Sequence, residues 1–177
     1  MYLKVAGAVL VIVSSAAMGI GYGRKLKEHL EELRYLKQIY IMVYGELRYT
    51  KAPIPEIMLE ISRRIKSPYA NLFRSAHTAW EEQGNLNFPK WFQEEANRVI
   101  GDYRKEKKLT EEEWELFLAI GSQTGYMDLQ MQLGALKNYM ERWDMLIRKA
   151  ENDIGPKQRI GNCLGILSGI FLSVLLL

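Results

Sequence analysis

The last segment of the chain, residues 160–177, contains no charged side chain, and this tail constrains the fold more than any other feature. A helix of this length reaches about 27 Å, close to the thickness of the hydrocarbon layer of a membrane. Residues 5–23, near the other end, are also free of charge. The sequence therefore predicts transmembrane helices at 1–23 and 160–177, with one domain at 24–159 between them.

Basic residues lie on the inner side of both apolar segments. Arg24, Lys25 and Lys27 follow the first segment, and Lys157 and Arg159 precede the second. Because basic residues near membrane spans favour the cytoplasmic side, the sequence predicts a protein of the cell membrane with its central domain in the cytoplasm.

The first apolar segment also permits an alternative. Lys4 precedes it and Ser15-Ala16-Ala17 lies within it, as in a cleavable signal peptide. Cleavage would leave a secreted or tail-anchored helical module that binds another protein. The basic cluster directly after the segment argues against export.

Small residues recur at every fourth position in both apolar segments. Such a stripe lets two helix backbones approach closely in lipid. We therefore predict helix packing, within the chain or between copies of a homo-oligomer, through Ser15, Gly19 and Gly23 and through Gly161, Gly165 and Gly169.

The domain between the segments shows helical periodicity throughout. Apolar residues at steps of three and four predict that the first helix continues to about Tyr49, where Pro53 and Pro55 follow. A second seam, Leu129 to Ile154, predicts a helix of matching length that packs antiparallel to the first. With four short helices between them, the sequence predicts an all-α antiparallel bundle of about six helices.

Cap signals divide the middle of the chain. The sequence predicts N-caps at Ser67 and at Thr110, the latter in a capping box with Glu113, and a helix end at Gly84. A further helix is expected to start near Pro89, and the helix that follows Thr110 is expected to run to Thr124. A turn at Gly125 and an N-cap at Asp128 then precede the last long helix, which we expect to kink at Gly155-Pro156.

The sequence contains no catalytic, metal-binding or cofactor-binding motif. His29, His77 and Cys163 are its only histidines and cysteine, and neither histidine lies three residues after a glutamate as a helical dinuclear metal site requires. Mixed, dispersed charge does not favour nucleic acid. Because Trp91 and Phe92 are adjacent and cannot both face the core, we expect one of them to contact a protein partner.

Several spacings together resemble a known family. Glu46-x-x-Tyr49 stands before Pro53-Ile54, and Gly121, Gly125, Asp128 and Gln132 precede or open the last helix. With both apolar ends, this pattern resembles the stage III sporulation protein AB family of endospore-forming bacteria. Pro156 departs from the continuous last helix expected there.

The resemblance implies a non-enzymatic platform or assembly subunit of the channel complex between mother cell and forespore. It implies a fold similar to the inner-membrane platform protein of type II secretion. The expected partners are a cytoplasmic ATPase, stage III sporulation protein AA, and other stage III sporulation membrane proteins. The expected location is the mother-cell membrane facing the forespore.

Overall fold

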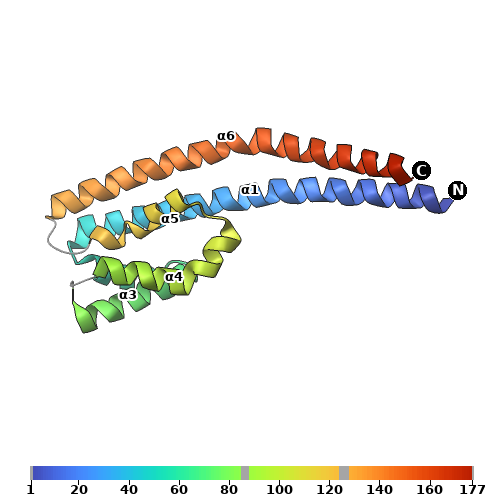
Figure 1. Ribbon diagram of the computed structural model, residues 1–177. Coiled ribbons are helices and arrows are strands. Elements are labelled where there is room, and N and C mark those ends of the chain that lie inside the picture. The colour runs from blue at the N-terminus through green and yellow to red at the C-terminus, as the bar shows by residue number, and fades with distance from the viewer. Residues whose placement is uncertain (1, 85–87, 124–127, 177) are drawn as a thin grey trace. The chain divides into compact units, whose positions relative to one another are not determined.

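The computed structural model describes the backbone of residues 2–84, 88–123 and 128–176, and the side chains of 21–82, 84, 88–122, 128–160, 163 and 167. This described part is helical and contains no strand, which confirms the all-α prediction (Figure 1). Its elements are α1 (Tyr2–Thr50), α2 (Ile54–Ser62), α3 (Tyr69–Gln83), α4 (Phe88–Lys107), α5 (Glu111–Leu118), the short 3₁₀ helix η1 (Gly121–Gln123) and α6 (Leu129–Leu176). The sequence predicts four short helices between two long ones, and α2 to α5 lie between the long helices α1 and α6.

The chain divides into two compact units, and both long helices contribute to each. The first unit contains Met1–Glu31 and Ile147–Leu177, and the second contains Glu32–Leu146. In the first unit, Gly23 of α1 is buried, and a Cβ atom at this position would lie 3.1 Å from the side chain of Gln158 on α6. Gly23 therefore permits a close approach between these two helices.

In both predicted membrane spans, most side chains lie outside the part of the chain that the structure describes. Across the residues that are described, no helix offers an apolar segment of the length that a bilayer requires. Of the predicted packing residues, Ser15, Gly19, Gly161, Gly165 and Gly169 have no described side chains. The two spans, at 1–23 and 160–177, stay predictions.

In the second unit, α1 and α6 meet through aromatic side chains. The ring of Tyr40 lies 6.0 Å from that of Tyr139 and 6.1 Å from that of Trp143. The Tyr40 hydroxyl donates a 2.5 Å hydrogen bond to the backbone carbonyl of Leu116 on α5. At the edge of this contact, the Lys37 ammonium lies 2.6 Å from the Asp144 carboxylate. The predicted seams thus do meet, and Tyr40 joins them to α5.

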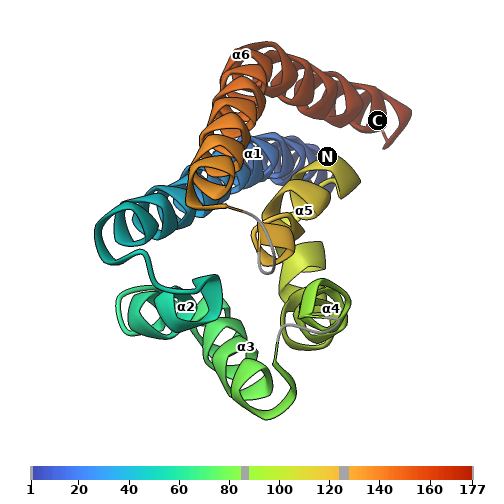
Figure 2. The ribbon, with the colours of Figure 1, turned by 90° about the vertical axis from the view of Figure 1, so that its left-hand side faces the viewer.

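The short helices bury the apolar faces that their periodicity predicts. Helix α2 packs against α3, α3 against α4, and α4 against α5 and η1 (Figure 2). Ring contacts connect these helices, with Phe117 of α5 at 5.3 Å from Tyr69 and at 6.4 Å from Phe92. Fully buried side chains on these faces include Met58, Ile61, Leu72, Phe73, Ala76, Ala96 and Ile100.

Two of the predicted helix ends are confirmed. At α5, the Thr110 N–H donates to the Glu113 carboxylate at 2.7 Å and the Glu113 N–H donates to the Thr110 hydroxyl at 3.3 Å, which completes the capping box. Gly84 ends α3 with φ +68° and ψ −158°. Residues other than glycine rarely adopt this backbone conformation, because their Cβ atom is too close to the backbone.

Two other predicted ends are wrong. Ser67 does not cap α3, because Pro68 occupies the cap position and the carbonyls of Lys66 and Pro68 accept the first N–H groups. The helix that begins after Thr110 ends at Leu118 rather than Thr124, because the following N–H groups bond three residues back. Helix α6 continues through Pro156, and the kink there stays a prediction.

Candidate functional site

A groove among the described residues is formed by the end of α1, by α2 and by α3. It holds about 510 Å³ of space, within the usual range of ligand pockets. Four of its lining residues are glutamates and none is lysine or arginine, although the groove also has apolar walls. The lining residues are Glu46, Thr50, Ala52, Glu56, Ile57, Leu59, Glu60, His77, Trp80 and Glu81.

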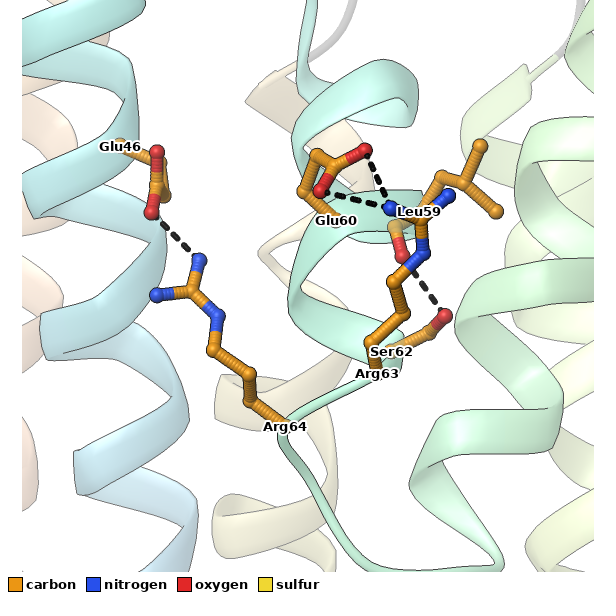
Figure 3. Close-up of polar contacts among 6 residues, drawn as sticks. All are labelled: Glu46, Leu59, Glu60, Ser62, Arg63 and Arg64. Atoms are coloured by element: carbon orange, nitrogen blue, oxygen red, sulfur yellow. Dashed lines mark hydrogen bonds and ion pairs between the residues drawn. The ribbon is translucent and has the colours of Figure 1, made fainter.

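Two of the four carboxylates at this groove bind guanidinium groups of the same chain. The Arg64 side chain extends from the end of α2 towards α1 and forms an ion pair with Glu46 (Figure 3). Beside it, the Arg63 guanidinium lies 3.3 Å from the Glu60 carboxylate (Figure 3). The side chains of Glu60 and Glu81 remain 57% and 62% exposed. Both carboxylates can therefore accept further hydrogen bonds from outside.

A second cluster surrounds a buried carboxylate, that of Glu32 on α1. The Tyr69 hydroxyl of α3 donates to it at 2.6 Å, and the Tyr103 hydroxyl of α4 donates at 3.1 Å. Burial, and next the negative charge of Glu32, raise the pKa of Tyr69 and the pKa of Tyr103 above the usual tyrosine value. Both hydroxyls therefore stay protonated and can donate. This cluster ties three helices together, which is a structural role.

The helix-turn residues predicted at the start of α6 are only partly described. Asp128 directly precedes α6, and its carboxylate accepts a 3.3 Å hydrogen bond from the Gln130 N–H. The Gln132 N–H donates to the Asp128 carbonyl at 3.0 Å, as in an ordinary first turn. Gly125 lies outside the described residues. Gly121 belongs to η1, and a Cβ atom there would lie 2.5 Å from the ring of Phe92.

The structure separates the two aromatic residues proposed as partner contacts. Phe92 is fully buried and cannot be a surface anchor, because its ring packs against Gly121 and Phe117. Trp91 is half-buried and lines a shallower pocket of about 370 Å³ between α3 and α4. Of this pair, the candidate partner contact is therefore Trp91.

Sequence reasoning missed the groove. Glu46, Glu60 and Glu81 come from three helices, and no periodicity relates residues so far apart in the chain. Their helices could be predicted, but which faces meet depends on packing. No group of three or more histidine, cysteine, aspartate or glutamate side chains in the described part is placed to hold a metal ion.

Over the residues that the structure describes, the helices and grooves define an all-α protein with concave surfaces on its helical bundle. The chain belongs to the stage III sporulation protein AB family, whose pattern matches residues 4–177. It is 22% identical over 175 residues to stage III sporulation protein AB of Bacillus subtilis (strain 168), and the similarity covers 99% of both chains. No solved structure matches this chain. Membership in the family implies a role in sporulation.

Proposed function

We propose that this chain is a non-enzymatic, membrane-anchored platform subunit of the sporulation channel complex between mother cell and forespore. It engages a cytoplasmic ATPase, expected to be stage III sporulation protein AA, and is required for endospore formation. The observation that carries this proposal is the family match over residues 4–177, which includes both apolar ends and the helical domain between them.

Anchoring is supported by the two charge-free segments. Residues 5–23 belong to α1 and residues 160–177 mainly to α6, the two helices that form the first unit. A charge-free helix of such length is favoured in lipid over water. The basic residues beside both segments favour a cytoplasmic location for the second unit. The family relationship suggests that the membrane is the mother-cell membrane facing the forespore.

A platform role is supported by the way the second unit is built. Tyr40 connects α1, α5 and α6, and Glu32 connects α1, α3 and α4. A body tied to the same helix that enters the membrane can transmit force between a cytoplasmic motor and membrane partners. The resemblance to the type II secretion platform protein suggests the same arrangement, with other stage III sporulation membrane proteins and further copies of this chain as neighbours.

The topology is tested by cysteine labelling of the full chain in cells. The background is Cys163→Ser, and the probes are the exposed positions Glu60→Cys, Lys105→Cys and Lys137→Cys. A membrane-impermeant maleimide should label them only after the membrane is permeabilised. Labelling in intact cells would place the body outside. Loss of residues 1 to about 17 from the mature protein, measured by mass spectrometry, would favour the signal-peptide alternative.

Partner engagement is tested by co-expression with stage III sporulation protein AA and capture of the full chain from detergent extract. We expect the ATPase to co-purify. A full-length, folded chain that captures neither the ATPase nor any other stage III sporulation membrane protein would contradict the proposal.

A further inference from the structure

We propose that the groove between α1, α2 and α3 is a docking surface for a lysine- or arginine-bearing segment of a protein partner. This inference rests on the proposed function, which supplies a protein partner. It adds which face of the chain makes the contact and what chemistry the partner presents.

The charge of the groove selects the class of occupant. Four of its described lining residues are glutamates, and none is lysine or arginine. Thr50 also lies in the last turn of α1, where the helix dipole places partial negative charge, and Glu46 lies one residue before that turn. Arg63 and Arg64 partly neutralise Glu60 and Glu46. The exposed carboxylates of Glu60 and Glu81 still attract ammonium and guanidinium groups and disfavour the phosphates of nucleic acids and lipid headgroups.

The spacing of the carboxylates favours a peptide segment over a single ion. No three of the described carboxylate or histidine groups are close enough together to share a metal ion. Glu46, Glu60 and Glu81 instead extend from three different helices around a space of about 510 Å³. A segment with several cationic side chains can reach carboxylates that one ion cannot bridge.

The walls of the groove fit the remainder of such side chains. Lysine and arginine carry an aliphatic stem below the charged group, and apolar surface stabilises that stem. Ile57, Leu59 and Trp80 provide this surface beside the glutamates. The indole face of a tryptophan also attracts cations. The pairs formed by Arg63 with Glu60 and by Arg64 with Glu46 show that carboxylates of this groove accept guanidinium groups.

The test uses the full chain co-expressed with stage III sporulation protein AA, and compares capture by wild type with capture by Glu60→Lys/Glu81→Lys. Both glutamates are more than half exposed, at 57% and 62%. Charge reversal there should leave folding intact, because surface pairs contribute little to stability. The matched control is Glu106→Lys/Glu141→Lys, a reversal of two exposed glutamates on α4 and α6 outside the groove. Denaturant unfolding verifies that all three proteins are folded.

We expect the groove variant to lose about tenfold or more in capture, with the control unchanged. Wild-type capture should weaken as salt rises, because exposed charges are screened. Lys/Arg→Glu changes in the partner segment that restore capture by the groove variant would establish direct contact. Equal capture by the groove variant and wild type overturns the docking surface and leaves the proposed function standing. Absence of wild-type capture contradicts the ATPase engagement and the docking surface together.

Discussion

Gly121 and Phe92 pack so closely that a Cβ atom on Gly121 would lie 2.5 Å from Cδ1 and 2.8 Å from Cγ of the Phe92 ring. This contact joins η1 to the fully buried face of α4. From the sequence, Gly121 is predicted in a helix-turn motif and Phe92 is one of two candidate partner contacts. Their contact shows that both belong to the core of the second unit.

Replacement of Gly121 by alanine should therefore destabilise the protein. The Phe92 ring is fully buried and packs against the rings of Phe88 and Phe117, so an added Cβ overpacks this core. Overpacking of a core costs about 1–3 kcal/mol. Denaturant unfolding of the full chain measures the change. Gly101→Ala on α4 is the matched control, because nothing lies within 4 Å of its added Cβ. That variant should gain about 0.5–1 kcal/mol from better helix propensity. Equal stability of the two variants would contradict the packing role of Gly121.

Loss of the Glu32 carboxylate should loosen the contact of α1 with α3 and α4. Glu32→Ala leaves the buried Tyr69 hydroxyl without its acceptor, and we expect a cost of about 3 kcal/mol in unfolding free energy. Glu32→Gln keeps an acceptor oxygen and should cost about 1 kcal/mol. Glu31→Gln, at the exposed neighbouring position, should change stability by less than about 0.5 kcal/mol. A cost for Glu32→Ala no greater than that of Glu31→Gln would show that the hydrogen bonds add no stability.

Removal of the Thr110 side chain should weaken the start of α5. Thr110→Ala deletes the hydroxyl that accepts from Glu113 N–H, and loss of an N-cap costs about 1 kcal/mol. Thr78→Ala serves as the comparison, since the Thr78 hydroxyl donates to Arg74 O within α3 and caps no helix. We expect that variant to unfold at nearly the wild-type denaturant concentration. A reversed order of the two variants would argue that α5 is held by packing alone.

Alkaline titration should separate buried from exposed tyrosines. Burial raises the pKa of Tyr40, Tyr69 and Tyr103, and the Glu32 charge raises the latter two further. Because the folded-state pKa is higher than the unfolded one, these groups stabilise the fold at neutral pH, and that contribution falls as pH rises above about 10. Absorbance at the phenolate band should show that at least two tyrosines, the fully buried Tyr40 and Tyr69, ionise only when the protein unfolds. Complete ionisation before loss of helical circular dichroism would refute their burial.

Local patterns were sufficient for most of the helices. The seam of α1 and the seam of α6 predicted two long helices, and Gly84 and the Thr110–Glu113 pair marked real ends. Such signals lie within a few residues of the feature that they specify. Two predictions from local patterns were wrong. Ser67 does not cap α3, because backbone carbonyls accept its first N–H groups, and the helix predicted to reach Thr124 ends at Leu118.

The sequence by itself determined the all-α class, the long helices with four short ones between them, and the charge-free ends, because hydrophobic periodicity and charge are properties of neighbouring residues. Tertiary structure alone decided that Phe92 is buried against Gly121 and that Glu32 accepts two tyrosine hydroxyls. It also decided that Glu46, Glu60 and Glu81 share one groove. These residues lie far apart in the chain, and only the packing of one helix on another brings them together.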